Sequence, residues 1–487
     1  MSLQFITGNS GNGKTEYLFN RIVKEAKENP RDNYLVIVPE QFTMQTQRQL
    51  VDLSENKVIM NIDVLSFKRL AYRVFDELGI TNLTVLEETG KNLVLRKLAA
   101  QEADKLGVIG RNLNRIGYIS EVKSLLSELV QYNISPEELG RYIASGRLSD
   151  TLSDKLKDVL VLYEAFEKFM QDKYITAEEI LNVLSNVAEE SAILRNSVIA
   201  FDEFTGFTPI QNQLIKKLFV ISKKIYVTLT IDCREDIFKS RGMQELFDMP
   251  KRTVKSLTEM AAFYGIEVEE PIILDKNYRL AENEELSFME QQLFRKRRCS
   301  FKKAPKHIHI DCLRDPKQEL TKIARRINEL VRNENLRYRD IAIVTGDVNI
   351  YAGYVREIFD KYNIPYFIDA TQEILFHPFI EFIRSIPDIA AQNFSADAVF
   401  RFLRCGFSEL LDSEIDVLEN YVLACGVRGK SAWDKKWVRL PKHKAGYDLE
   451  LLNQSREYIM ELLKPVYQVF SDKKSTVKDY VLAIYKL

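Results

Sequence analysis

The chain has 487 residues, more than one hydrophobic core usually organises, and this length predicts three or four folded units. Hydrophobic residues make up 46% and charged residues 29%, with only 19 glycines and 13 prolines, which is typical of a helix-rich folded protein and excludes dominant disorder. Lys plus Arg number 69 against 70 Asp plus Glu, so no global basic field draws the chain to nucleic acid or to an anionic membrane. Any contact with nucleic acid must therefore use local patches.

The cysteines and the hydropathy pattern bear on cofactors and location. Five cysteines are widely scattered, with no CxxC pair, so neither a zinc site nor an iron–sulfur site is supported within these residues. An odd cysteine count without a signal peptide favours a reducing cytoplasm. No apolar run approaches the roughly 18 residues that a membrane span requires. We therefore expect a cytoplasmic protein.

The first 80 residues alternate predicted strands and helices. Residues 2–7 read as a buried strand, and a glycine-rich turn then leads into a segment with helical spacing of apolar residues. Residues 34–38 and 58–65 predict two more strands, and an amphipathic helix follows the second of these. This alternation predicts an α/β fold.

The rest of the chain divides by its pattern. Residues 81–188 are almost purely helical, which predicts an insertion, and strands return at 197–201 and 224–231. After a basic connector, HIHIDCL (307–313), a helix from Pro316 and the strand DIAIVTG (340–346) predict another α/β unit. Helices follow from about 376, and the final amphipathic segment leads us to expect that the natural chain continues past Leu487.

The octet GNSGNGKT at Gly8–Thr15 satisfies the phosphate-binding P-loop pattern and lies between a predicted strand and a predicted helix. Glycines let backbone N–H groups surround phosphate oxygens, Lys14 neutralises the β- and γ-phosphates, and the Thr15 hydroxyl can bind Mg²⁺. The alternative is a chance glycine turn. The predicted nucleotide-binding residues are Gly8, Asn9, Ser10, Gly11, Asn12, Gly13, Lys14 and Thr15.

A Mg²⁺-dependent nucleotide site also needs a carboxylate at the end of a neighbouring strand. SVIAFDEF supplies Asp202 and Glu203 directly after an apolar run. Asp202 is the candidate to hold Mg²⁺ through water, and Glu203 is the candidate catalytic residue that orients or deprotonates the attacking water. The alternative is an ordinary acidic exit from a strand.

An ordered series of motifs resembles the B subunit of the ATP-dependent helicase/deoxyribonuclease complex called AddAB or RexAB, which is itself similar to superfamily 1 helicases. The series covers roughly residues 3–385. Besides the P-loop, its members are VPEQFTMQTQ, DVLSFKRLAYRVF, VLEETGKNLVLRKL, FDEFTGFTPIQ, NYRL, YRDIAIVTGD and IPYFIDATQEILFHPFIEFI.

The resemblance implies a P-loop NTPase fold with RecA-like domains and helical insertions. The implied domains are the first part of domain 1A at 1–80, a helical 1B insertion at 81–190, the return of 1A at 191–294, a basic connector at 295–306, domain 2A at 307–375 and the beginning of a helical 2B insertion at 376–487.

The resemblance also assigns residues. Gln41 and Phe42 fall near motif Ia, and Ser66 and Phe67 near motif Ib, which face single-stranded DNA in related helicases. Arg279 stands where such helicases keep an arginine that senses the γ-phosphate. Among aromatic residues, the motif order favours Phe42, Phe67 and Tyr278 for contact with bases or nucleotide.

Parts of the motor pattern are absent. No glutamine motif precedes the P-loop, and after YVTLTID the glycine–aspartate–glutamine signature of motif III is replaced by CRED (233–236). The family further implies a motor subunit of the AddA/RexA type as heterodimer partner, DNA as substrate, and a nuclease domain and a 4Fe-4S cluster whose cysteine ligands would lie beyond Leu487.

Two basic stretches have competing interpretations. Residues 295–306 hold seven Lys/Arg in twelve residues, which suits either a path for DNA phosphates or a solvated linker. Trp433 and Trp437 lie among basic residues and could stack on unpaired bases, but tryptophans four apart also suit the buried face of a helix, which we favour.

Three functions remain open on this evidence. The first is an ATP-binding, helicase-like subunit that processes DNA double-strand breaks for recombinational repair. The second is a DNA-scanning scaffold that binds ATP and barely hydrolyses it, which the missing glutamine favours. The third, a P-loop kinase or small-molecule NTPase, leaves the later motifs unexplained.

Overall fold

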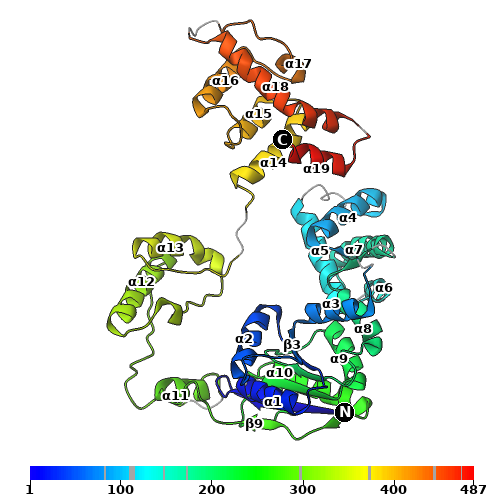
Figure 1. Ribbon diagram of the computed structural model, residues 1–487, viewed down its shortest axis with the longest axis vertical. Coiled ribbons are helices and arrows are strands. Elements are labelled where there is room, and N and C mark those ends of the chain that lie inside the picture. Colours follow the sequence, from blue (N-terminus) through cyan, green and yellow to red (C-terminus); the bar gives the residue numbers. More distant parts are fainter. Residues whose placement is uncertain are drawn as a thin grey trace. The chain divides into compact units, whose positions relative to one another are not determined.

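The computed structural model describes residues 1–81, 84–108, 116–145, 148–171, 174–295, 299–370, 374–441, 446–472 and 474–487. Parts of three sequence features, at 296–298 in the basic connector, 371–373 in the IPYF motif and 442–445 after Trp437, lie outside these ranges. The chain forms two compact units, Met1–Ile310 and Asp311–Leu487 (Figure 1). Among the described residues, no helix combines the length and apolarity needed to cross a membrane.

A parallel β-sheet forms the centre of the first unit, which confirms the α/β prediction. Its strand order is β3-β2-β6-β7-β1-β8, and β9 also pairs with β1. The strands are β1 (Ser2–Gly8), β2 (Tyr34–Ile37), β3 (Ile62–Leu65), β6 (Val198–Phe201), β7 (Lys224–Thr230), β8 (Glu267–Val268) and β9 (Ile272–Leu274). Every strand of this sheet pairs in parallel with its neighbours, and β1 and β7 pair over seven residues, from Ser2 opposite Lys224 to Gly8 opposite Thr230.

Helices cover both faces of the sheet, as a buried parallel sheet requires. One face packs against α1 (Lys14–Glu28) and α2 (Thr43–Leu53) through a core that includes Ile6, Phe19 and Val36. The opposite face packs against other helices through a second core. These are α3 (Phe67–Leu78), α8 (Ile180–Val187), α9 (Pro209–Ile221) and α10 (Asp248–Phe263). Helix α11 (Glu284–Gln292) follows the last strand of the sheet.

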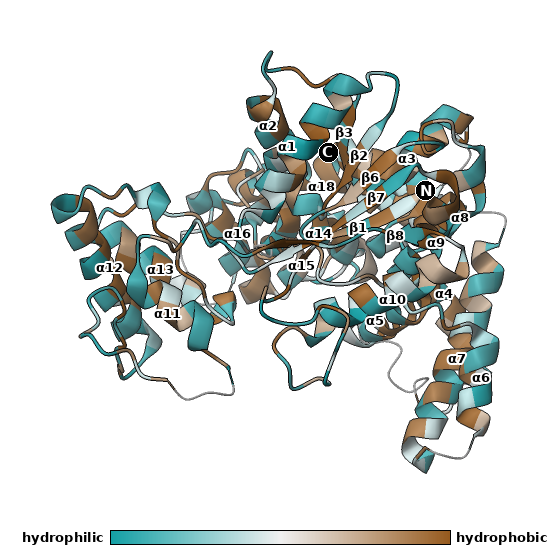
Figure 2. Cartoon of the chain, turned by 90° about the horizontal axis from the view of Figure 1, so that it is seen from below, coloured by the Kyte–Doolittle hydropathy of each residue, from teal (hydrophilic) through white to brown (hydrophobic). Residues whose placement is uncertain are grey.

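The predicted helical insertion forms between α3 and α8. Its helices are α4 (Glu88–Gln101), α5 (Ile116–Gln131), α6 (Pro136–Ala144) and α7 (Asp150–Met170), and they share a core of their own. Figure 2 shows hydrophobic and hydrophilic residues on the same helix, for example on α7, as an amphipathic helix requires. Two short strands, β4 (Val85–Leu86) and β5 (Ile175–Thr176), pair in parallel at the start and end of this region, which the sequence predicted to be almost purely helical.

The second unit is helical in its described residues. Helices α12 (Pro316–Asn333) and α13 (Val348–Lys361) pack together through Leu320, Ala324 and Phe359. The predicted C-terminal helices form a separate core. They are α14 (Pro378–Ala391), α15 (Ala396–Leu403), α16 (Asp412–Cys425), α17 (Lys430–Trp433), α18 (Leu449–Ser471) and α19 (Val477–Tyr485).

The strand predicted at 340–346 does not form, and neither does a strand in HIHIDCL (307–313), so the prediction of an α/β unit is wrong in these segments. A strand needs a neighbour in register and a face that is buried. In these segments Ile310 is 94% exposed and Val344 is 92% exposed, so their apolar side chains are not covered. Of the predicted α/β unit at 307–375, the described residues form its helices only.

Both tryptophans are buried, as the interpretation that we favoured requires, but they do not share one helix face, because α17 ends at Trp433 and Trp437 lies beyond it. Trp433 is 0% exposed and Trp437 is 7% exposed. Their rings contact each other edge to face with centroids 5.2 Å apart, and Trp437 also stacks on Tyr421. Neither ring offers a free face for an unpaired base.

Replacing Trp433 by alanine should lower the free energy of unfolding of this helical core by about 3–5 kcal/mol, because it leaves a large cavity. Urea denaturation followed by the emission of the remaining Trp437 measures this. As a control, Leu440→Ala removes a half-exposed side chain and should cost no more than about 0.5 kcal/mol. Equal stabilities for the two variants would contradict the buried role of Trp433.

Candidate functional site

The candidate site lies where β1, β6 and β7 end. Parallel strands present their carboxyl ends at one edge of a sheet, and ligands of open α/β sheets bind outside that edge. The loop Gly8–Thr15 leaves β1 there, Asp202 and Glu203 follow β6, and Thr228 and Thr230 close β7. Residues far apart in the sequence therefore meet at one edge.

The glycine-rich loop Gly8–Thr15 turns tightly into α1. Gly11 and Gly13 have φ angles of +87° and +77°, which most residues other than glycine reach only with strain. A Cβ on Gly11 would lie 2.8 Å from Cβ of Arg279, so glycine also permits a close approach of that segment. Gly13 is the residue before α1, so the amides that open this helix face the site.

Lys14 lies against its own loop. Its Nζ donates a hydrogen bond to the carbonyl of Asn9 at 3.0 Å. Burial lowers the pKa of Lys14, while the Asp202 and Glu203 carboxylates act to raise it. The ammonium group is therefore poorly solvated and satisfied by a single backbone oxygen, a contact that an incoming anion can replace.

Asp202 is 1% exposed, and its two carboxylate oxygens differ in their hydrogen bonding. Oδ1 accepts a hydrogen bond from the Thr228 hydroxyl, whereas among the described residues Oδ2 has no partner in hydrogen-bonding geometry. Burial raises the pKa of Asp202, Glu203 raises it further, and the Thr228 and Thr15 hydroxyls act in the opposite direction. A buried carboxylate oxygen without a partner is costly, and a cation would satisfy it.

Glu203 adopts an unusual backbone conformation, with a φ angle of +63°. Strain of this kind in a residue other than glycine concentrates at functional sites. The Thr15 hydroxyl donates to Oε1 of Glu203 at 3.5 Å, so the two candidate side chains face each other.

Residues 277–279 approach the loop from the segment after β9. The N–H of Tyr278 donates to the Gly11 carbonyl at 2.9 Å, and Asn277 Nδ2 donates to the Ser10 carbonyl at 3.0 Å. The Tyr278 ring lies beside Gly13, where an added Cβ would stand 3.6 Å from Cδ2 of the ring. Tyr278 is 63% exposed. Arg279 approaches the Ser10 hydroxyl at 3.4 Å. This segment brings an aromatic face and a guanidinium to the loop.

These groups line one open cavity of about 760 Å³. Its size suits a nucleotide, since small-molecule sites commonly occupy about 300–1,000 Å³. Lys14, Thr15, Asp202, Glu203 and Arg279, which the sequence predicted for the site, all line it. Of the loop, Ser10, Gly11 and Gly13 also line it, while Asn9 and Asn12 are buried beneath, and Asn12 Nδ2 donates to the Leu274 carbonyl.

The residues predicted for DNA contact lie farther along the same edge, after β2 and β3. Gln41 is exposed and Phe42 is partly buried. Ser66 is buried, donates to Glu40 and caps α3 by accepting the N–H of Arg69. Phe67 is 7% exposed and packs against the Phe201, Phe204 and Phe207 rings, so its ring is a core element without a free face for a base.

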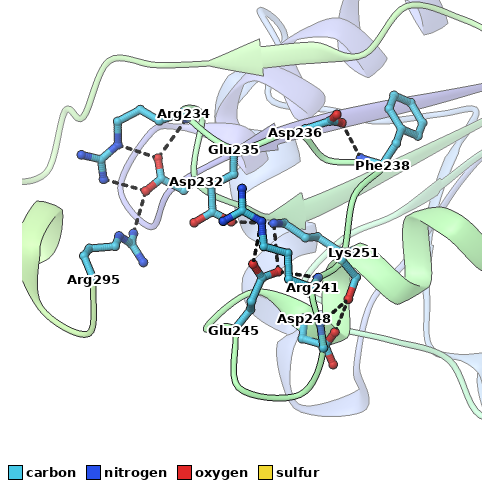
Figure 3. Close-up of polar contacts among 12 residues, drawn as sticks. Asp232, Arg234, Glu235, Asp236, Phe238, Arg241, Glu245, Asp248, Lys251 and Arg295 are labelled. Atoms are coloured by element: carbon cyan, nitrogen blue, oxygen red, sulfur yellow. Dashed lines mark hydrogen bonds and ion pairs between the residues drawn. The ribbon is translucent and has the colours of Figure 1, made fainter. Parts of the chain in front are cut away.

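An ion-pair network occupies the segment after β7, where the sequence lacks the glutamine signature (Figure 3). Asp232 is buried and accepts hydrogen bonds from Arg234 at 2.6 and 2.8 Å and from Arg295 at 2.7 Å. Although burial acts to raise the pKa of Asp232, the hydrogen bonds from Arg234 lower it. Arg295, the first residue of the basic connector, is therefore an ion-pair partner of the core. Lys303 of the connector likewise pairs with Glu284.

Sequence reasoning missed several residues of the site. Thr228 sits inside an ordinary strand pattern, and only the pairing of β6 with β7 reveals it as the partner of Asp202. Asn277 lies within NYRL but was not predicted for the site, although its side chain donates a hydrogen bond to the Ser10 carbonyl of the loop. Glu290 on α11 accepts a hydrogen bond from Asn9 at 2.7 Å, and no motif marks it.

Comparison with known proteins finds relatives that carry the same name. Three of them are named as the B subunit of an ATP-dependent helicase/deoxyribonuclease. That of Lachnoclostridium phytofermentans is 39% identical over the whole chain and 43% of the relative. That of Clostridium tetani is 33% identical over the whole chain and 43% of the relative, and that of Clostridium acetobutylicum is 34% identical over 90% of the chain and 38% of the relative.

The chain spans less than half the length of each of these relatives. Residues 5–290, more than half of the chain, match the family described as ADDB, N-terminal, and this match includes the whole candidate site. The resemblance read from the ordered motifs is thereby confirmed, and the chain belongs to the AddB N-terminal family.

Proposed function

We propose that the chain is the ATP-binding, helicase-like portion of a heterodimeric helicase/exonuclease that processes DNA double-strand breaks for recombinational repair. The observation that carries this proposal is the single cavity into which Lys14, Thr15, Asp202, Glu203 and Arg279 converge. In this role the loop Gly8–Thr15 is a P-loop. The relatives' names, which combine ATP dependence with helicase and deoxyribonuclease, support the same role.

The loop fits a triphosphate. Lys14 leaves the Asn9 carbonyl to contact the β- and γ-phosphates, and the amides at the start of α1 face the same anion. Arg279, which approaches Ser10 of the loop, would contact the γ-phosphate. The Tyr278 side chain, 63% exposed and with Lys276 Nζ over its ring at 4.8 Å, would offer the purine a stacking surface on the other face, in place of the missing glutamine motif.

The donor set also fits Mg²⁺, which prefers oxygen ligands and bridges phosphates to one or two protein groups. Thr15 Oγ1 and the unpartnered Oδ2 of Asp202 would hold the ion, and Thr228 fixes which oxygen of Asp202 is available. When bound, Mg²⁺ neutralises charge on the phosphates. Glu203, held beside Thr15, orients the attacking water or accepts a proton from it.

The remaining assignments follow from the family. We keep the implied domains with two changes. Helix α8 packs on the sheet of RecA-like domain 1A (1–80 and 191–294), so the 1B insertion (81–190) ends before α8, and the described residues of domain 2A (307–375) form its helices without its strands. The connector is at 295–306 and the 2B insertion begins at 376. Single-stranded DNA crosses the edge near Gln41, Phe42 and Ser66. A motor subunit of the AddA/RexA type is the partner, and the nuclease and its 4Fe-4S cluster belong to the part of the relatives that this chain does not span.

A second candidate is a DNA-scanning scaffold that binds ATP and barely turns it over. The ion-pair network after β7 favours it, because Asp232 is saturated by Arg234 and Arg295 and no glutamine follows it to couple DNA to the γ-phosphate.

Lys14→Ala should weaken ATP binding by roughly 10- to 150-fold, the factor expected for about 1.5–3 kcal/mol in a hydrogen bond to a charged group. Isothermal titration calorimetry with Mg²⁺ and a non-hydrolysable ATP analogue measures this. Lys24→Ala, on the exposed side of α1, is the matched control and should bind as the wild type does. Absence of nucleotide binding by the wild-type chain would overturn the proposed function.

Glu203→Gln separates the two candidates. If the chain hydrolyses ATP, the variant should retain ATP affinity and lose DNA-stimulated turnover by about 10²-fold or more, since it loses a general base. Phosphate release with single-stranded DNA, in the absence of the partner subunit, measures this. Turnover no faster than the protein-free background in both proteins would instead favour the non-hydrolysing scaffold, whereas equal and measurable turnover would contradict the catalytic role of Glu203.

The contribution of Mg²⁺ to nucleotide affinity should fall as the pH is lowered from 7.5 towards 4. Asp202 binds the ion only when ionised, and its pKa is raised, so protons compete with the metal at higher pH than for an ordinary aspartate. Nucleotide affinity with and without Mg²⁺ across this range measures the effect. Asp202→Asn should show little gain from Mg²⁺ at any pH, and an equally pH-independent gain in the wild type would contradict the role of Asp202.

A further inference from the structure

A short loop, residues 434–440, follows α17 and is anchored to the helical core of the second unit by the buried Trp437. The backbone N–H of Trp437 donates to Asn453 Oδ1 on α18, and the Trp437 carbonyl accepts from Asn453 Nδ2, both at 2.9 Å. The indole N–H donates to the Ala432 carbonyl of α17 at 3.0 Å. Trp437 therefore fixes the middle of the loop through its ring and through its backbone.

Further polar contacts fix the loop on either side of Trp437. The Tyr421 hydroxyl on α16 donates to the Arg439 carbonyl at 2.7 Å. Arg456 on α18, only 5% exposed, donates to the Trp433 carbonyl at 2.8 Å, where α17 leads into the loop. Burial of an arginine is costly unless its N–H groups find partners, and here one of those partners is the backbone that enters the loop. Helices α16, α17 and α18, which share one core (Figure 1), thus hold the loop in a defined conformation.

The charged side chains that this loop presents to solvent are mainly basic. Lys435, Lys436 and Arg439 are exposed, and none of them forms an ion pair with an acidic side chain of the described residues. The carboxylate of Asp434 is paired with Lys430 at 2.7 Å. The chain as a whole has a net charge of −1, so this loop is a local concentration of positive charge on a fixed backbone.

The spacing of these charges suits a row of phosphates. Arg439 comes three residues after Lys436, a stretch that spans at most about 11 Å. Each strand of duplex DNA carries one charge per about 3.4 Å of helix axis, so side chains this close together can reach neighbouring phosphates. Because the loop backbone is already fixed, its ordering costs little free energy on binding.

An anionic membrane is the alternative partner, because Val438 and Leu440 of the same loop are 78% and 52% exposed. Segments that lie in a membrane interface usually insert large apolar or aromatic side chains. Here the rings of Trp433 and Trp437 are buried in the protein core, which leaves only two aliphatic side chains for that purpose. The loop therefore suits a nucleic-acid backbone better than a lipid surface.

We infer that Lys435, Lys436 and Arg439 form a contact surface for the phosphate backbone of DNA on the second unit, with Trp437 as the residue that positions it. The choice of DNA as the partner rests on the proposed function. Contacts of this kind hold a strand in place without reading its sequence. The basic residues around the tryptophans thereby acquire a function, although the tryptophans do not stack on bases.

Fluorescence anisotropy of a labelled single-stranded oligonucleotide, titrated with the 487-residue chain at several salt concentrations, tests this inference. The loop variant combines Lys435→Gln, Lys436→Gln and Arg439→Gln. A charge-preserving variant combines Lys435→Arg, Lys436→Arg and Arg439→Lys. Urea denaturation checks that each variant is as stable as the wild type, which we expect because all three side chains are exposed.

A matched control removes the same amount of charge elsewhere in the second unit. It combines Lys474→Gln, Lys478→Gln and Lys486→Gln, which are exposed positions at α19 and in the turn before it. A general effect of net charge on DNA binding would weaken this control as much as the loop variant.

Each phosphate contact on a single strand contributes about 0.7 to the slope of log affinity against log salt. The loop variant should therefore lose about 2 from the size of that slope, and bind roughly 10- to 100-fold more weakly near 0.1 M salt. The charge-preserving variant and the control should bind as the wild type does. A wild-type slope in the loop variant, an equal loss in the control, or no DNA binding by the wild type would overturn the inference.

Two parallel measurements separate the possible failures. Binding to vesicles of phosphatidylcholine and phosphatidylserine identifies a membrane surface, and the inference is wrong if the loop variant loses vesicle binding and keeps its DNA binding. Calorimetry with Mg²⁺ and a non-hydrolysable ATP analogue follows the nucleotide site, which the loop variant should leave unchanged. If the wild type binds no nucleotide but the loop variant alone loses DNA affinity, the proposed function fails and the DNA surface stands.

Discussion

Parallel pairing of β7 with β6, and of β1 with β7 and β9, determines where the polar groups of the site lie. Phe201 stands opposite Val227 in this register, so Asp202 comes next to Thr228 and receives its hydroxyl hydrogen bond. A slip of one residue would bring an apolar side chain, Val227 or Leu229, beside a carboxylate that is almost completely buried. The core on both faces of the sheet enforces the register, and the register in turn supplies Asp202 with the partner that lets it be buried.

The same edge holds polar groups that lack partners. Among the described residues, Asp202 Oδ2 is buried without a hydrogen bond, and Lys14 Nζ donates only to the Asn9 carbonyl. Each such group costs free energy while it lacks a partner, and a ligand that satisfies them recovers that free energy on binding. A triphosphate with its cation has the complementary charges, which is why this cavity suits a nucleotide better than an apolar molecule.

The local features of the fold and site could be predicted from the sequence, because they depend on short-range patterns. The buried strand 2–7, the glycine turn and the helix after it follow from neighbouring residues, and Asp202 and Glu203 follow from their place after an apolar run. Features that depend on contacts between distant parts of the chain could not be predicted from the sequence. Thr228 and Glu290 acquire their roles from strand register and helix packing, and Phe67 is a core residue although its motif suggested an exposed ring. The α/β unit predicted around 307–313 and 340–346 shows the reverse error, since an apolar alternation forms a sheet only where a partner strand buries it.

A crystal structure of the chain with Mg²⁺ and a non-hydrolysable ATP analogue tests the central claim most directly. The position of Lys14 Nζ is the decisive observation, since Nζ donates to the Asn9 carbonyl in the structure described above. The nucleotide site that we propose predicts that Nζ moves to the β- and γ-phosphates, with the metal between Thr15 and Asp202. An analogue bound elsewhere, or bound here with Lys14 still on the Asn9 carbonyl, would contradict it.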